Sequence, residues 1–160
     1  MEIDEVINTL RSGWITTGVK TKELEKKLAE FCHTSKLVCL SSATAAEEMN
    51  FRICGIGEND EVIVPAYTYT ASASAAIHCG AKVVFVDNKK DSTEMDYNKV
   101  ASSITSKTKA IVAVDLGGII ADYDKLFEVV ESKKNMFVPG GNTELGKRIQ
   151  KTIGRVLIFS

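Results

Sequence analysis

Apolar residues follow two alternating spacings along the chain. Some segments repeat them every three or four positions, which is typical of helices with one buried face. Between these segments lie short apolar runs bounded by glycine or proline, which are typical of strands. Because apolar strands without polar alternation are covered on both faces, the pattern favours an α/β fold with a mostly parallel sheet between helix layers.

The two spacings predict an ordered set of elements. The first predicted helix carries Ile3, Val6, Ile7 and Leu10 on one face and ends near Ser12 and Gly13. The later predicted helices are one that carries Leu24, Leu28 and Phe31, one that begins around Thr44, and residues 71–79, 96–104 and 122–133. The predicted strands are residues 36–40, 61–65, 83–87, 110–114 and 154–159. Residues 135–154 are expected to form an irregular loop, over 136–148, and a short helix.

Length and charge narrow the classes of function. With 160 residues, of which 44% are apolar, the chain can bury the core of one ordinary domain. Its 20 basic and 21 acidic side chains give a net charge of -1, so no positive excess indicates binding to nucleic acid or to an anionic membrane. A small molecule or a protein is therefore the expected partner.

Cysteine usage and the chain start indicate a compartment. The four cysteines are Cys32, Cys39, Cys54 and Cys79, and no two form a CxxC pair. They are expected to be free thiols in a reducing environment. The acidic residues after Met1 do not resemble a signal peptide, and no run reaches the about 20 apolar residues of a membrane span. We therefore expect a soluble, cytoplasmic protein.

The segment Ser41-Ser42-Ala43-Thr44-Ala45 lies between a predicted strand and a predicted helix. Small residues let the backbone approach an anion, hydroxyls add donors, and the free N–H groups of a helix start favour a phosphate. The same residues would also be expected if serine and threonine only capped the helix. The local sequence favours capping, since neither a Walker lysine nor a GxGxxG pattern is present.

Other polar segments have simpler interpretations. Tyr67 and Tyr69 follow Pro65 and could lie against a flat heterocycle, although core packing of both rings is favoured locally. The glycines of residues 55–60 precede a strand, which indicates a helix-to-strand turn instead of a dinucleotide loop. Glu47 and Glu48 are expected to be solvated near a helix start. No metal site is expected, because His33, His78, Asp87 and Asp115 lack neighbours at ligand spacing.

Taken in order, several phrases resemble the DegT/DnrJ/EryC1/StrS aminotransferases, which are pyridoxal-phosphate (PLP) enzymes of fold type I. The phrases are SGWITTG at 12–18, SSATAA at 41–46, GIGENDEVIVP at 55–65, GAKVVFVD at 80–87, DLGG at 115–118 and ADYD at 121–124. Together they cover most of residues 3–134. The resemblance implies a partial three-layer α/β/α sandwich, the N-terminal part of the PLP-binding large domain over residues 1–160, without the small C-terminal domain.

The resemblance also assigns roles to individual residues. Ala43, Thr44 and Ala45 match the helix start that binds the cofactor phosphate, which replaces the capping interpretation. Tyr69 matches the aromatic residue that stacks on the pyridine ring, while Tyr67 stays assigned to packing. The loop that lines the sugar-nucleotide site is matched by Trp14, Thr16, Thr17 and Gly18.

For the intact enzyme, the resemblance implies amino transfer from glutamate to a nucleotide-linked keto sugar, with PLP as cofactor and a homodimer as the assembly. The family's pyridine-pairing aspartate and Schiff-base lysine are expected beyond Ser160, so residues 1–160 alone are expected to be inactive. One alternative is a non-catalytic folded remnant that self-associates or binds a partner through exposed apolar surfaces. Another is an unrelated nucleotide-binding α/β domain.

Overall fold

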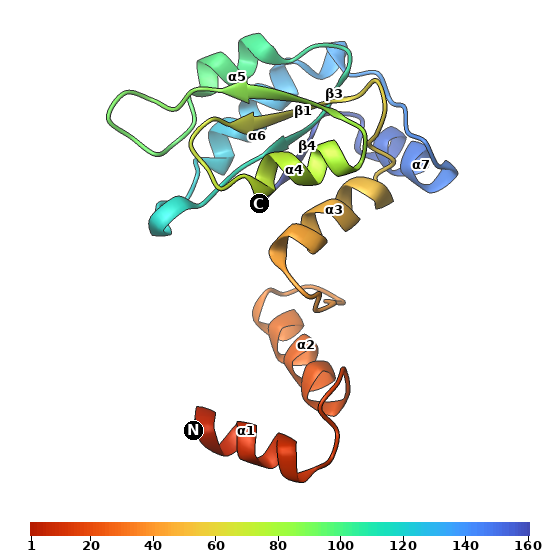
Figure 1. Ribbon diagram of the computed structural model, residues 1–160. Helices are drawn as coiled ribbons and strands as arrows, with labels where there is room; N and C mark the ends of the chain where they lie inside the picture. The colour runs from red at the N-terminus through yellow and green to blue at the C-terminus, as the bar shows by residue number, and fades with distance from the viewer. The chain divides into compact units, whose positions relative to one another are not determined.

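The computed structural model describes residues 1–160, which divide into two compact units, Met1–Ser41 and Ser42–Ser160. The first unit contains helices α1, Glu2–Arg11, and α2, Val19–Phe31 (Figure 1). Lys20 of α2 forms an ion pair with Glu5 of α1. Both helices were predicted from their apolar spacing, and the prediction is confirmed.

The strand predicted at residues 36–40 does not form. The unit Met1–Ser41 contains no β-strand, so the segment has no neighbour there with which to share backbone hydrogen bonds. The Cys39 N–H instead donates to the Glu25 carboxylate at 2.9 Å, and the Val38 side chain is exposed. The prediction was wrong because strand propensity produces a strand only where a partner is available.

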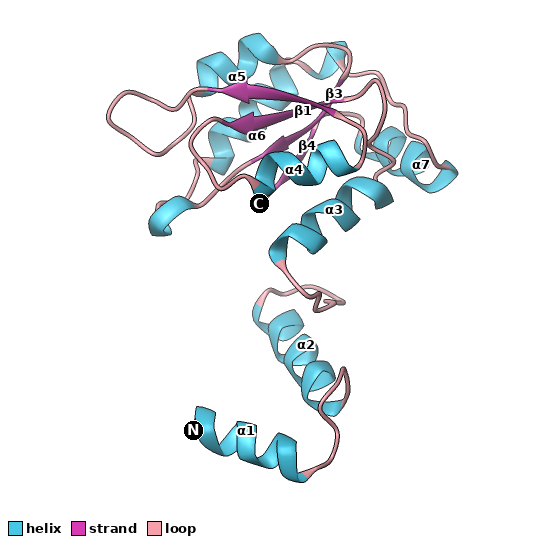
Figure 2. Ribbon diagram, viewed as in Figure 1, coloured by secondary structure: helices cyan, strands magenta, loops and turns pink.

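The second unit is built on a four-stranded sheet in the order β2-β1-β3-β4, with all neighbours parallel (Figure 2). The strands are β1, Glu61–Pro65, β2, Lys82–Val86, β3, Thr108–Val112, and β4, Leu157–Phe159. These strands confirm the predicted parallel sheet, although β3 begins two residues earlier than predicted and β4 keeps only the last three residues.

Helices connect and cover the strands of this unit. They are α3, Ala43–Ile53, α4, Ala71–His78, α5, Tyr97–Ser103, α6, Tyr123–Ser132, and α7, Glu144–Ile153, with short 3-10 turns η1, Leu116–Gly118, and η2, Lys134–Met136. Asp96 caps α5 and Asp122 caps α6 through their carboxylates. These starts agree with the sequence prediction. None of these helices combines the length and the apolar composition that a membrane span requires.

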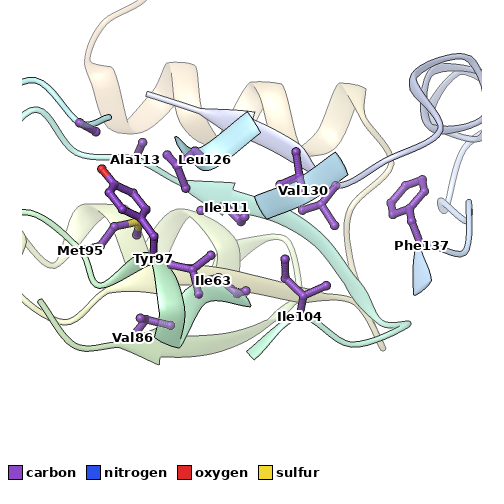
Figure 3. Close-up of a cluster of buried hydrophobic side chains, with 13 residues drawn as sticks. Ile63, Val86, Met95, Tyr97, Ile104, Ile111, Ala113, Leu126, Val130 and Phe137 are labelled. Carbon is purple, nitrogen blue, oxygen red and sulfur yellow. The ribbon is translucent and has the colours of Figure 1, made fainter. Parts of the chain in front are cut away.

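Alternating side chains of the strands build a core on each face of the sheet. Ile63 and Ile111 point to one face, where α5 and α6 contribute Tyr97 and Leu126 among others (Figure 3). Val62 points to the opposite face, against the helices that include α3 and α4. The predicted three-layer α/β/α arrangement is therefore confirmed.

The predicted loop over 136–148 is only partly correct. Helix α7 begins at Glu144, because the Thr143 hydroxyl accepts a hydrogen bond from the Gly146 N–H at 3.0 Å. The signal for this start was present, since Leu145, Ile149 and Ile153 recur every four residues behind a threonine.

Helix α7 is held closely against the end of α3. A Cβ on Gly146 would lie 2.5 Å from the Gly55 Cα, so only glycine fits there. The buried Gln150 amide donates to the Cys54 carbonyl at 2.8 Å and its oxygen accepts from the Gly140 N–H at 2.9 Å. Gly55, at a φ of +69°, starts the predicted turn from α3 into β1. This packing fixes the C-terminal end of α3.

Candidate functional site

The first turn of α3 has free backbone donors. The Ser42 hydroxyl accepts a hydrogen bond from the Ala45 N–H at 3.1 Å. Ser42 is therefore the N-cap of α3, as the local sequence predicted. The N–H groups of Ala43 and Thr44 and the Thr44 hydroxyl have no acceptor within the protein. A helix start with two open N–H groups and a hydroxyl is suited to a phosphate. Capping and anion binding are therefore compatible here, with Ala45 occupied by the cap.

This helix start lies at the edge of the sheet where the parallel strands end. Helix α3 leads into the first residue of β1 and α4 follows the last, so both helices begin at the carboxyl edge of the sheet. A cavity of about 240 Å³ opens there. It is lined by Ala43, Ala46, Glu47, Asn50, Ser72, Val112, Ala113, Val114, Phe159 and Ser160. Carboxyl edges of parallel strands are the usual ligand sites of open α/β sheets.

Glu47 departs from the sequence prediction. It was expected to be solvated, but its Oε1 atom is buried and has no hydrogen-bond partner. Burial raises the pKa of the Glu47 carboxyl to about 7. The reason is its position in α3, which turns the side chain toward the cavity, where Ala43, Ala46 and Asn50 also lie. Ala43, four positions before Glu47, and Asn50, three positions after it, share its helix face and were the sequence signal that this face is covered.

Glu48 lies on the outer side of the same helix. Its carboxylate accepts from the Arg52 guanidinium at 2.7 Å and lies 3.1 Å from the His78 Nδ1. The hydrogen bonds from Arg52 and then His78 lower the pKa of Glu48. The prediction of a charged, accessible carboxylate thus fits Glu48 and fails for Glu47.

The two tyrosines after β1 are both exposed. Tyr69 is 79% exposed in the turn before α4, and Tyr67 is 62% exposed. The packing predicted for Tyr67 was wrong, because the chain leaves the sheet after Pro65 and Tyr67 belongs to neither apolar core. Tyr67 instead lines an open pocket of about 760 Å³ with residues that include Asp87 and Asn88. The Tyr69 ring is accessible, and its stacking role stays a prediction.

The loop predicted to line the sugar-nucleotide site lies within the first unit. Its tryptophan, Trp14, donates from Nε1 to the Thr17 carbonyl at 3.1 Å, and a Cβ on Gly18 would lie 2.3 Å from that same nitrogen. Trp14 and Thr16 line a pocket of about 560 Å³ between α1 and α2. Thr17 and Gly18 lie outside this lining: the Thr17 carbonyl holds the indole, and Gly18 leaves room for it.

The side chains that could hold a metal ion do not cluster, and the cysteines form no disulfide. No three His, Cys, Asp or Glu side chains come close enough together to hold a metal ion. All four cysteines are free, and Cys54 is buried.

Comparison with known proteins identifies the family of the chain. A model of the DegT/DnrJ/EryC1/StrS aminotransferase family matches residues 1–140. The chain belongs to this family. Its PLP-dependent members are fold type I aminotransferases, and the parallel sheet between two helix layers described above is part of that fold.

Three similar proteins show how much of a family member the chain represents. It is 37% identical to the spore coat polysaccharide biosynthesis protein SpsC of Bacillus subtilis strain 168, over 82% of this chain and 34% of that protein. It is 38% identical to the UDP-4-amino-4-deoxy-L-arabinose–oxoglutarate aminotransferase of Shewanella sediminis strain HAW-EB3, over 83% and 34% respectively. Spr1654 of Streptococcus pneumoniae, described as a sugar aminotransferase and solved in its PLP form, is 52% identical with a TM-score of 0.89, over 98% and 38%. The chain thus spans little more than a third of the length of these relatives.

Proposed function

We propose that this chain supplies the cofactor-phosphate and ring-stacking residues of a PLP-dependent aminotransferase that acts on a nucleotide-linked keto sugar. The observation that carries the proposal is the pair of open N–H groups at the start of α3, in a chain of this aminotransferase family. When bound, PLP serves as the electron sink of amino transfer. The protein's part is to position and orient the reactants.

The relatives' names support a class of substrate. The Shewanella sediminis relative is named for a nucleotide-linked amino sugar and for oxoglutarate, the keto acid of glutamate. The Bacillus subtilis relative is named for polysaccharide biosynthesis. We therefore propose glutamate as amino donor and a keto-sugar nucleotide as acceptor, in a cytoplasmic homodimer.

Five of the predicted site residues have a direct task in this proposal. Ala43 and Thr44 donate hydrogen bonds to the phosphate oxygens, and the dipole of α3 favours the negative charge. The exposed Tyr69 ring covers one face of the pyridine ring. Trp14 and Thr16 contact the sugar nucleotide from their own pocket. No lysine lines the cavity beside α3, so residues 1–160 supply binding but no amine for covalent attachment there.

The phosphate assignment is tested by titrating the chain with inorganic phosphate and with PLP in a calorimeter. Thr44→Val removes one donor to a charged acceptor, so it is expected to weaken both affinities about tenfold. Thr152→Val, at an exposed position of α7, is the matched control and should bind as the unchanged chain does. Equal affinities of Thr44→Val and the unchanged chain would overturn the assignment.

Activity gives a second test. The 160-residue chain, incubated with PLP, glutamate and a nucleotide-linked keto sugar, is expected to form no oxoglutarate, because no lysine lies in the cavity. Steady production of oxoglutarate that depends on one lysine of the chain would contradict this expectation.

An exposed apolar surface favours a second candidate function. Ile3, Val6 and Leu10 on α1 are 74%, 60% and 63% exposed, a row that association would cover. A non-catalytic role through self-association or partner binding is therefore the alternative.

A further inference from the structure

Glu47 is the one ionisable side chain that lines the cavity beside α3. Its buried Oε1 has neither a donor nor a cation within hydrogen-bond distance. A buried carboxylate without a partner is strongly disfavoured, whereas the neutral acid needs far less solvation. The cavity therefore favours the protonated form of Glu47.

The groups around the carboxyl are neutral apart from one. Asn50 of α3 and Ser72 of α4 are polar but uncharged, and the lining residues from β3 and its end are apolar. The strand β4 contributes Phe159 and Ser160, whose α-carboxyl is the other titratable group of the lining. Burial alone accounts for the raised pKa of Glu47, with no contribution from a neighbouring charge. No lysine, arginine or histidine lines the cavity to balance a negative charge on Glu47.

Glu47 also lies close to the proposed phosphate site. It follows Ala43 by four residues, about one helical turn or roughly 6 Å along the axis. Both residues line the same cavity. A phosphate dianion at the open N–H groups of Ala43 and Thr44 would therefore repel a carboxylate at Glu47 across a poorly solvated space.

We propose that Glu47 is a proton-linked positioning residue of the phosphate site, which binds a proton from solvent more tightly when a phosphate group occupies the start of α3. The inference rests on the proposed function of that helix start. The neutral acid removes the repulsion, and its O–H supplies a donor within the cavity. Because proton binding and phosphate binding are linked, the affinity for phosphate falls as the pH rises and Glu47 loses its proton. Titration of the phosphate itself adds a separate pH dependence.

The test compares the 160-residue chain with its Glu47→Gln variant, which holds the neutral form at every pH. Inorganic phosphate and PLP are titrated into each at pH 5.5 and at pH 8.5. At pH 5.5 the two proteins should bind equally. At pH 8.5 the variant should bind about tenfold more tightly, which corresponds to a rise of one unit in the pKa of Glu47 on binding. Both proteins bind the same ligand, so the ratio of their affinities at each pH is unaffected by titration of the ligand.

Controls separate the possible outcomes. Glu48→Gln changes the neighbouring outward carboxylate and should keep the pH dependence of the unchanged chain. If phosphate binds but the ratio of the two affinities is the same at pH 5.5 and pH 8.5, this inference alone is overturned. No phosphate binding by either protein overturns the proposed function and this inference with it.

A measurement on the unchanged chain covers the case in which the variant fails to fold. With ¹³C-labelled glutamate, the carboxyl resonance of Glu47 reports its titration directly. Saturating phosphate should move its midpoint upward by about one unit. An unmoved midpoint in the presence of bound phosphate overturns the inference.

Discussion

Two adjacent glutamates of α3 show how far the surroundings of one residue type can differ. Glu48 is held as a carboxylate by Arg52 and His78, while Glu47 has a buried oxygen without a partner. One position along a helix turns a side chain by about 100°, from solvent into the cavity. The pH behaviour of the chain is therefore expected to depend on Glu47 more than on its neighbour.

The free energy of unfolding of the ligand-free chain should depend on pH through Glu47. The folded-state pKa of Glu47, about 7, lies above its ordinary value of 4.5. The protonated acid therefore stabilises the fold below about pH 4.5, and this contribution is lost as the pH rises through 7. Relative to Glu47→Gln, the chain should lose about 1–3 kcal/mol of unfolding free energy between pH 5 and pH 8. Urea unfolding at both pH values measures it, and a constant difference would contradict the prediction.

The Trp14 loop allows a spectroscopic test. Trp14 is the only tryptophan of the chain, so its fluorescence reports on this loop alone. In Gly18→Ala the new Cβ collides with the indole and breaks its bond to the Thr17 carbonyl, so the emission should shift to the red. Lys22→Ala, exposed on α2, should leave the spectrum unchanged. An unaltered spectrum in Gly18→Ala would show that the indole is not held this way.

At the scale of elements, the contact between α3 and α7 depends on one missing side chain. Gly146→Ala would place a Cβ 2.5 Å from the Gly55 backbone, and that backbone cannot yield as a flexible side chain could. We expect a loss of about 1–3 kcal/mol of stability despite the better helix propensity of alanine. Thr152→Ala in the same helix should stay within about 0.5 kcal/mol of the unchanged chain. Thermal unfolding compares them, and equal stability of the two variants would refute the close contact.

Most elements could be predicted because their signals are local. Asp96 and Asp122 mark helix starts through their own carboxylates, and Pro65 marks the end of β1. The strand predicted at 36–40 depended on a neighbour that its own residues cannot specify. Likewise, the open N–H groups of α3 follow from the sequence, whereas the orphaned oxygen of Glu47 depends on strands more than 60 residues away. Local propensity gives the elements, and tertiary contacts decide what surrounds each side chain.

For the whole molecule, the exposed row on α1 predicts association. Val6 is 60% exposed, and covering such side chains with those of another copy removes apolar area from water. The 160-residue chain should therefore form larger species as its concentration rises, and Val6→Lys should weaken this. Asn8→Lys adds the same charge at a polar position of α1 and serves as control. Multi-angle light scattering measures the mass, and a monomer at all concentrations would contradict the prediction.

The strand order β2-β1-β3-β4 has a consequence for synthesis on the ribosome. The first strand to emerge, β1, is joined on one side by β2 and on the other by β3, and β4 then adds beside β3. Each new strand thus attaches to an outer edge, and none has to insert between two that are already paired. The sheet can therefore grow in step with translation, which shortens the time that apolar strands wait unpaired.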